Sequence, residues 1–335
     1  MNDLQINTRH RGRTLLVVEG FHEEQVLIPS LARAFPEILG HDPDILVYRT
    51  NIYVLYGKLT KIYGDDLSES DIDLPFVISS DRDMSEVLYK RDFINIILIF
   101  DYERHDPNFS EERICLLQKL FSDMTDNGQL YLNYPMVESY WDFEAFPDVG
   151  FMKRKVLIRR RGSEYKSELN DSFIKYSIEL PLRIEDVLIE RFDSLAADKR
   201  KSCIDEILKN SKEVLDIKRI NHILSKYVKS GDTFETANLF RAMLNKTKYW
   251  DEGSYRDYMR KILLQIVSHM IKKGAVLSGI NEVRAVGNPK EEYACIDLSA
   301  ILDNQNNEGK TTGYVWVLNT SVLIVAEYNL DILNG

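Results

Sequence analysis

The stretch that most constrains the fold runs from Thr14 to Gln25 and reads TLLVVEGFHEEQ. The apolar residues Leu15 to Val18 lead directly into Glu19 and Gly20. An unbroken apolar run that ends in a glycine and precedes a helical pattern is typical of a buried parallel strand that turns into a helix. Ligands bind at the carboxyl ends of the strands in open α/β sheets, so the position of Glu19 predicts a functional role.

A second stretch, from Phe93 to Arg104, has the same organisation. An isoleucine-rich apolar run is followed directly by Asp101 and, one residue further on, by Glu103. In an extended D-x-E segment the two acidic side chains point the same way, because the side-chain period of a strand is two. We therefore expect Glu19, Asp101 and Glu103 at one edge of a sheet.

The remaining periodicity predicts two domains. The first, residues 13–150, is expected to be an α/β domain with an open, mainly parallel sheet and flanking helices, interrupted by an insertion at about 65–92. The second, residues 151–335, is expected to be a mainly helical accessory or interaction domain, and a return of its C-terminal segment to the first domain stays open. The predicted elements are helices at 22–35, 52–62, from 110, 183–195, 199–214, 217–229 and 255–273 (ending at Gly274), strands at 44–49, 130–137 and 313–318, and either a strand or a helix at 319–329.

Composition narrows the functional classes. The chain has 43 basic and 53 acidic residues and a net charge of −10, which argues against a protein that coats DNA through many phosphate contacts. It has no apolar run of membrane-spanning length and no signal-peptide pattern at its N-terminus, so we expect a cytoplasmic protein without membrane contact. The three cysteines are far apart and show no CxxC spacing, which indicates neither a disulfide framework nor a zinc site.

Clustered carboxylates cannot all stay ionised without a compensating cation. Carboxylate oxygens are hard ligands, and a site built from Glu19, Asp101 and Glu103 suits Mg²⁺ or Mn²⁺. The sequence therefore predicts a divalent-metal site at the edge of the sheet.

The order of these motifs over residues 13–145 resembles the TOPRIM domain of topoisomerases, primases, recombination proteins and OLD-type nucleases. Glu19 stands where that family has the acid of its first strand, and Asp101 and Glu103 stand at its D-x-D motif, with Glu103 in place of the commoner aspartate. The segment from Glu19 to Glu24 matches the E-G-x-x-D/E-E pattern of OLD-like members, which implies Glu23 as a further metal ligand. An acidic segment that such proteins carry after the fourth strand compares with residues 138–144.

The resemblance extends to stand-alone TOPRIM effectors of bacterial anti-phage systems. It implies a metal-dependent nuclease, with Glu19, Asp101 and Glu103 as catalytic residues, acting in antiviral defence or abortive infection with a separate partner ATPase. The chain itself has no GxxxxGK[ST] motif. DNA and RNA, including tRNA, stay open as substrates, and so does a homodimer. The alternative is a non-catalytic TOPRIM-like module that assembles with a partner protein.

Other charged residues near these motifs have weaker signals. A basic run in this acidic chain is a candidate phosphate track, although a solvated basic face is the ordinary interpretation. Glu138, Asp142 and Glu144 are interpreted mainly as surface acids, and His22 and His105 mainly as exposed loop residues. The basic run comprises Lys153, Arg154, Lys155, Arg159, Arg160, Arg161 and Lys166.

Overall fold

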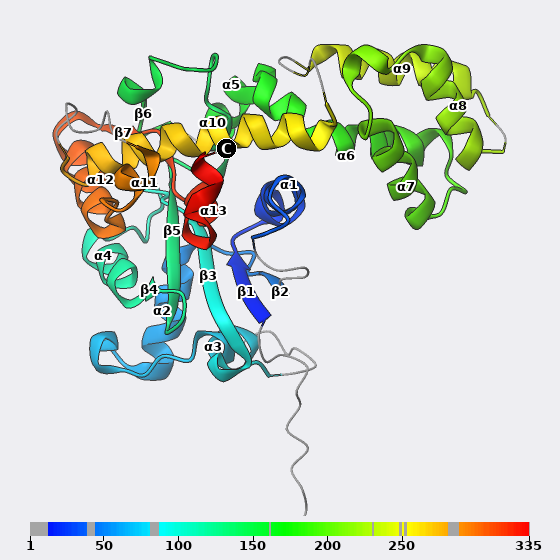
Figure 1. Cartoon of the computed structure of the whole chain (residues 1–335). Helices are drawn as coiled ribbons and strands as arrows, with labels where there is room; N and C mark the ends of the chain where they lie inside the picture. Colours follow the sequence, from blue (N-terminus) through cyan, green and yellow to red (C-terminus); the bar gives the residue numbers. More distant parts are fainter. Residues whose placement is uncertain are drawn as a thin grey trace, which may run out of the picture.

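The computed structural model describes residues 13–38, 44–80, 87–160, 162–229, 231–247, 250, 253–280 and 288–334. These residues form an open sheet with helices around it and a helical arm that projects to one side (Figure 1). The α/β class expected from the sequence is confirmed. Among the helices in these ranges, none combines the length and the apolar character needed to cross a membrane.

The sheet has the strand order β2-β1-β3-β5-β4, and β8 pairs with the end of β5. Strands β2, β1, β3 and β5 run parallel, whereas β4 and β8 are antiparallel to β5. The parallel strands β1 and β3 are continuous apolar runs because helices bury both faces of the sheet. Their carboxyl ends meet at one edge. The bounds are β1 (Arg13–Val18), β2 (Asp44–Val47), β3 (Phe93–Asp101), β4 (Ser122–Asp123), β5 (Gly128–Tyr134) and β8 (Leu318–Asn319).

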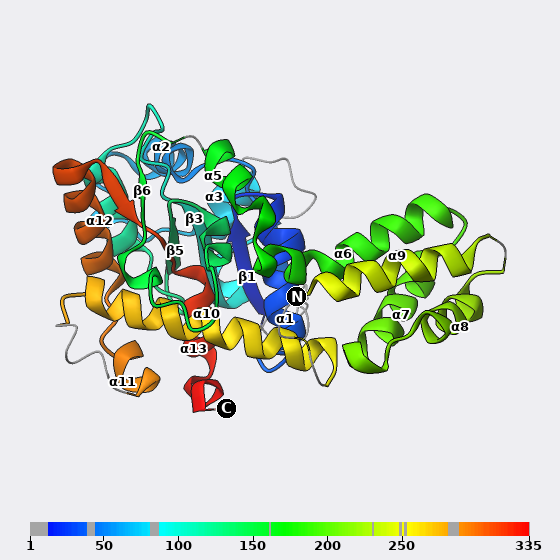
Figure 2. The ribbon, with the colours of Figure 1, turned by 90° about the horizontal axis from the view of Figure 1, so that it is seen from above.

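Helices cover both faces of this sheet (Figure 2). Helices α2 and α4 lie on one face, α1, α10 and α13 lie on the other, and α12 packs against α4 and α10 beyond β5. The side chains of Asn51 and Ser110 accept hydrogen bonds from backbone N–H groups in the first turns of α2 and α4, which fixes where these helices begin. The bounds are α1 (Ile28–Ala34), α2 (Ile52–Tyr63), α4 (Glu111–Leu120), α10 (Tyr255–Leu277), α12 (Leu298–Thr312) and α13 (Ile324–Tyr328).

The helical arm comprises α6 (Phe173–Arg191), α7 (Ala197–Leu208), α8 (Ile217–Tyr227) and α9 (Thr233–Lys246). Sequence periodicity predicted helices in the regions of α6, α7 and α8 but did not identify α9. Pro181 lies inside α6 and cannot donate to the carbonyl of Ser177. That carbonyl instead accepts a 2.5 Å hydrogen bond from the hydroxyl of Tyr255, so α10 compensates for the proline.

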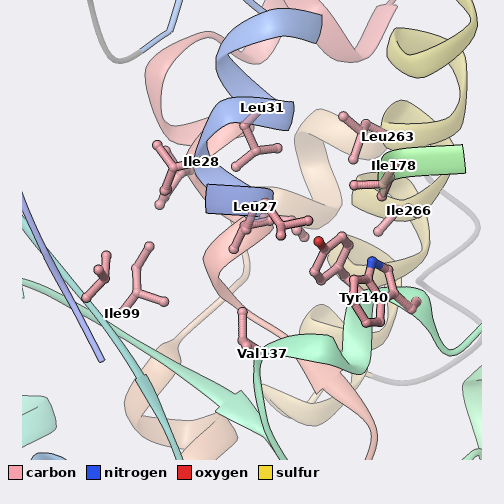
Figure 3. Packing of buried hydrophobic residues seen from close by; sticks show 14 of the residues in the cluster. Leu27, Ile28, Leu31, Ile99, Val137, Tyr140, Ile178, Leu263 and Ile266 are labelled. Atoms are coloured by element: carbon pink, nitrogen blue, oxygen red, sulfur yellow. The ribbon is translucent and has the colours of Figure 1, made fainter. Parts of the chain in front are cut away.

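Helix α10 joins the arm to the sheet. Leu27 and Leu31 pack with Leu263 and Ile266 of α10 and with Ile178 of α6, all of them buried (Figure 3). The arm is therefore anchored in the same hydrophobic core as the first helix of the sheet domain.

The prediction that α10 ends at Gly274 is wrong. The helix continues to Leu277, and a Cβ atom at Gly274 would lie only 3.4 Å from the side chain of Ile296. The glycine therefore lies inside the helix and does not end it. The remaining elements are α3 (Leu74–Ser80), α5 (Gly162–Glu168), α11 (Pro289–Tyr293) and the antiparallel pair β6 (Lys155–Leu157) and β7 (Tyr314–Trp316).

The segment that follows β7 lies against the carboxyl end of β5. The side-chain amide of Asn319 donates a 2.6 Å hydrogen bond to the carbonyl of Val137, and Ser321 donates to the side-chain oxygen of Asn133. These groups are buried. Residues more than 180 positions apart in sequence therefore complete the sheet beside the edge where the acidic motifs lie.

Candidate functional site

Acidic side chains from three segments lie at the carboxyl edge of the sheet. Glu19 follows β1, Asp101 is the last residue of β3, and Glu138 lies in a short 3₁₀ turn (Val137–Trp141) after β5. Glu23 begins a π-helical turn (Glu23–Leu27) that runs into α1. These four residues line one pocket of about 400 Å³, called here the carboxylate pocket.

Backbone N–H groups hold three of these carboxylates. The N–H of Asp101 donates a 3.1 Å hydrogen bond to Oε2 of Glu19, and the N–H of Val137 donates a 2.7 Å bond to Oδ1 of Asp101. The N–H of Gly20 donates a 3.2 Å bond to Oε2 of Glu23. The ends of β1 and β3 and the segment after β5 are thus connected through the acidic side chains themselves.

The acids raise one another's pKa. Burial, together with the charge of Glu103, raises the pKa of Glu19 to about 8. Burial likewise raises the pKa of Glu23 to about 7, with a contribution from Glu138. The pKa of Asp101 lies well above its usual value because the side chain is buried beside Glu19 and Glu23. Carboxylates in this arrangement favour either protons or a cation.

Glu138 is the site acid that sequence reasoning interpreted as a surface residue. It is only 3% exposed. Its Oε1 lies 2.8 Å from Nζ of Lys166 on α5, while its Oε2 is buried and has no hydrogen-bond partner in the structure. The available signal was its place directly after a strand that runs parallel to β3.

His22 stands at a helix start rather than in a loop, and its side chain is only 13% exposed. Its Nε2 lies 3.1 Å from the hydroxyl of Tyr140, and its ring meets the ring of Trp141 edge-on. Burial, together with the charges of Lys166 and Lys175, lowers the pKa of His22 to about 3. The imidazole is therefore neutral near pH 7 and acts as part of the pocket wall, whereas His105 is exposed.

Glu103 does not extend the line of β3. Its φ of 35° places it in the left-handed region, so the backbone turns there and the alternation expected of an extended D-x-E segment is lost. Oε2 of Glu103 accepts a 3.4 Å hydrogen bond from the side-chain amide of Asn51. Glu103 is near enough to raise the pKa of Glu19, yet it lines a different cavity of about 160 Å³, called here the second cavity.

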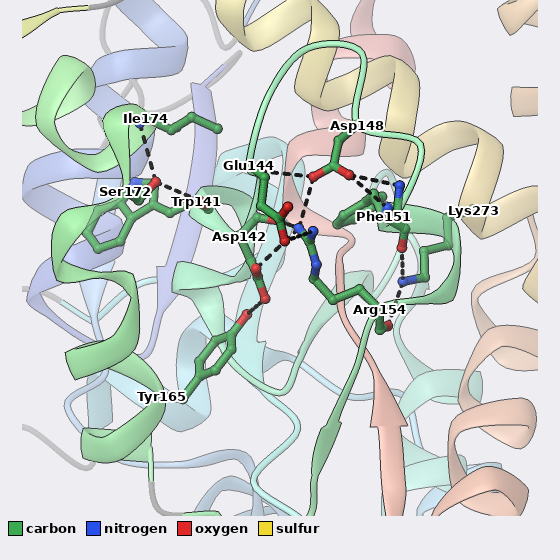
Figure 4. Close-up of polar contacts among 11 residues, drawn as sticks. Trp141, Asp142, Glu144, Asp148, Phe151, Arg154, Tyr165, Ser172, Ile174 and Lys273 are labelled. Carbon is green, nitrogen blue, oxygen red and sulfur yellow. Dashed lines mark hydrogen bonds and ion pairs between the residues drawn. The ribbon is translucent and has the colours of Figure 1, made fainter.

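The basic run does not form one continuous surface. Arg154 forms ion pairs with Asp142, Glu144 and Asp148, at 3.3, 3.0 and 3.0 Å, and donates to the backbone carbonyl of Asp142 (Figure 4). The other members of the run lie apart from this network. Lys155 pairs with Glu308, Arg160 pairs with Glu168, Lys153 and Arg159 are exposed, and Arg161 lies outside the described residues. Lys166 is the member of the run that lines the carboxylate pocket, where it pairs with Glu138.

The Arg154 network connects the site to α10 and to the arm (Figure 4). Nζ of the buried Lys273, on α10, donates hydrogen bonds of 2.8 and 2.9 Å to the carbonyls of Phe151 and Arg154. At the start of α6, the hydroxyl of Ser172 donates to the carbonyl of Trp141, which lines the carboxylate pocket. The segment that carries Glu138 is therefore held from several sides.

The oxygen donors of the carboxylate pocket fit a hard divalent cation, and the unpartnered Oε2 of Glu138 offers a free ligand atom. Within the described ranges, no three His, Cys, Asp or Glu side chains already stand in an arrangement that could hold a metal ion. Metal binding at this pocket therefore requires the carboxylates to turn toward a common point.

Comparisons with known proteins add no assignment to this geometry. No model of a protein family matches the chain. No characterised protein and no solved structure matches it either.

Proposed function

We propose that this chain is a divalent-metal-dependent nuclease with a TOPRIM-like site that hydrolyses phosphodiester bonds of DNA or RNA. The observation that carries the proposal is the meeting of Glu19, Glu23, Asp101 and Glu138 in one pocket at the carboxyl edge of a parallel sheet. Burial of so many acids is costly unless a cation compensates them.

The roles follow from the contacts. Glu19, Asp101 and Glu138 would hold Mg²⁺ or Mn²⁺, with Glu23 in the same pocket and Glu103 close enough for its charge to act on Glu19. When bound, the metal activates a water molecule and neutralises the leaving oxygen. Lys166 pairs with Glu138, and Lys175 also lines the pocket, so two positive charges stand among its acids. The backbone N–H groups of Asp101 and Val137 orient the carboxylates of Glu19 and Asp101.

The proposal includes a separate partner, an ATPase, in a bacterial anti-phage defence system, as in the effectors that the sequence resembles. The helical arm is the surface proposed for that partner. It carries the exposed apolar side chains of Ile189, Val214 and Phe234, which a helical bundle does not need for its own core. A symmetric dimer is the other use of such a surface.

The test combines metal binding with cleavage. The purified chain is titrated with Mn²⁺ and Mg²⁺ while its melting temperature is followed, and is then incubated with plasmid, single-stranded DNA and total RNA. We expect a metal-dependent rise in melting temperature and cleavage of at least one substrate, both lost in Glu19→Gln. If neither metal changes the melting temperature and no substrate is cleaved, the chain is instead a non-catalytic module that assembles with a partner.

A further inference from the structure

The second cavity and the carboxylate pocket are lined by residues that are direct neighbours in the sequence. Val137 lines the carboxylate pocket, and its neighbour Met136 lines the second cavity. On α5, Lys166 lines the carboxylate pocket and its neighbour Tyr165 lines the second cavity. Glu103 lines the second cavity while its charge acts on Glu19. A group in the second cavity therefore lies directly beside the carboxylates.

Most of the lining of the second cavity is apolar. The rings of Tyr102 and Tyr165 form part of the wall. Their hydroxyls are already hydrogen-bonded to Asn306 and Asp142, so it is the apolar part of each ring that is available to a ligand. Such walls favour a flat, weakly hydrated group over a phosphate or a sugar. The aliphatic part is Pro135, Met136, Val156, Leu157, Ile158 and Val315.

Polar groups stand among these walls. The imidazole of His105 is exposed, Arg160 is paired with Glu168, and Glu103 presents a carboxylate. Donors and acceptors are thus both available to the edge of a heteroaromatic ring. The volume of about 160 Å³ is well below the roughly 300–1,000 Å³ of pockets that take drug-sized ligands, and it matches a single ring system.

We propose that the second cavity binds one unstacked nucleobase of a single-stranded substrate, beside the phosphate that is cleaved. This proposal rests on the proposed nuclease function and adds the substrate class. Proteins recognise single-stranded nucleic acids through bases that leave the stack and enter apolar or aromatic pockets, where hydrogen bonds read the base edge. A base in a duplex reaches a cavity of this kind only after it is unpaired and flipped out of the stack, which costs free energy that a single strand does not spend.

The experiment uses short single-stranded DNA and RNA oligonucleotides, each with one abasic position that is moved along the strand. Cleavage by the full chain is measured in Mn²⁺, with the corresponding duplexes in parallel. We expect an abasic position at one fixed distance from the cut to slow cleavage about tenfold or more, since a base contact in such pockets is worth about 1–3 kcal/mol. Duplexes should be cleaved more slowly than single strands.

Two variants address the cavity itself. Leu157 is half exposed on β6, so Leu157→Trp fills the cavity without disturbing the core, and Leu157→Ala widens it. Both should weaken the dependence on the abasic position while the Mn²⁺-induced rise in melting temperature stays. The matched control is Val149→Trp, at an exposed residue outside both cavities, which should change neither measurement.

The outcomes separate the two proposals. If no abasic position changes the cleavage rate, the base cavity is overturned while the nuclease stands. The same conclusion follows if the Leu157→Trp variant depends on the abasic position as strongly as the wild type. Absence of both metal binding and cleavage overturns the nuclease and the base cavity together. Cleavage restricted to intact duplexes also overturns the base cavity.

Discussion

Val137 and Asp101 are joined by a 2.7 Å hydrogen bond from the backbone N–H of Val137 to Oδ1 of Asp101. Asp101 in turn donates its own N–H to Glu19, and Val137 accepts from Asn319 through its carbonyl. One chain of hydrogen bonds thus runs from the C-terminal segment through the end of β3 to the end of β1. The acidic site and the sheet edge are one connected structure.

Glu19→Gln should abolish metal-dependent cleavage and leave the fold intact. Glutamine has nearly the same shape, and its side-chain oxygen can still accept from the N–H of Asp101, but it lacks the charge that a cation needs. Cleavage rates and circular dichroism are measured together, with Glu24→Gln, the substitution of a half-buried acid outside the pocket, as the control. A folded Glu19→Gln variant with normal cleavage would remove Glu19 from the site.

The metal-free protein should lose stability as the pH rises from about 5 to about 8. The folded pKa values of Glu19 and Glu23, about 8 and about 7, lie above the ordinary value of 4.5. The folded state therefore binds more protons than the unfolded state in this range, and its stability is lost as pH rises through the folded pKa values. Glu19→Gln should flatten the fall in melting temperature.

Saturating Mn²⁺ should reverse this pH dependence, because the metal requires ionised carboxylates and its binding at pH 7 releases protons. Titration calorimetry in two buffers of different ionisation enthalpy measures that release. A melting temperature that is flat from pH 5 to 8 without metal would contradict the raised pKa values.

Arg154→Met should destabilise the protein by about 3 kcal/mol, because it removes the ion-pair partner of the half-buried Asp142 and the buried Asp148 and leaves their carboxylates only neutral hydrogen-bond donors. Arg159→Met, at an exposed residue, is the matched control and should change the free energy of unfolding by less than about 0.5 kcal/mol. Urea denaturation monitored by fluorescence gives both values. Equal effects would show that the Arg154 network does not stabilise the fold.

The same region tests the predicted phosphate track. If exposed members of the basic run contact nucleic acid, replacing Lys153 and Arg159 together by Glu should weaken binding and lower its salt dependence by about two ions. Binding is measured by fluorescence anisotropy at several salt concentrations. An unchanged slope would assign both residues to a solvated surface.

Tyr255→Phe should cost about 1–3 kcal/mol, because it removes the hydroxyl that donates to the Ser177 carbonyl, which Pro181 leaves without a helical partner. Tyr314→Phe, on an exposed residue of β7, serves as the control. The free energies of unfolding of the two variants are compared by urea denaturation. If both variants unfold with the same free energy as the wild type, a water molecule replaces the Tyr255 hydroxyl at the freed carbonyl without loss of stability.

The sequence was sufficient to locate β1, β3 and their terminal acids, because strands buried on both faces have a strong apolar signal. It was insufficient for Glu138, whose burial depends on Lys166 from α5 and on the distant segment that carries Asn319. Sequence reasoning also gave the wrong direction for the side chain of Glu103. Its backbone is in the left-handed region, so the alternation of side chains along a strand does not continue to this residue. Local sequence patterns identify helices and strands. The walls of this site instead depend on contacts between segments that are far apart in the sequence.

The pairing of β8 with β5 determines when the site can be completed during protein synthesis. Ribosomes release a chain from its N-terminal end, so the acidic ends of β1 and β3 emerge long before Asn319 reaches Val137. Until then β8 is not paired with β5, and the turn that carries Glu138 lacks the hydrogen bond that Asn319 donates to Val137. A nascent chain thus has the acids of the carboxylate pocket in its sequence before it has the scaffold that assembles them.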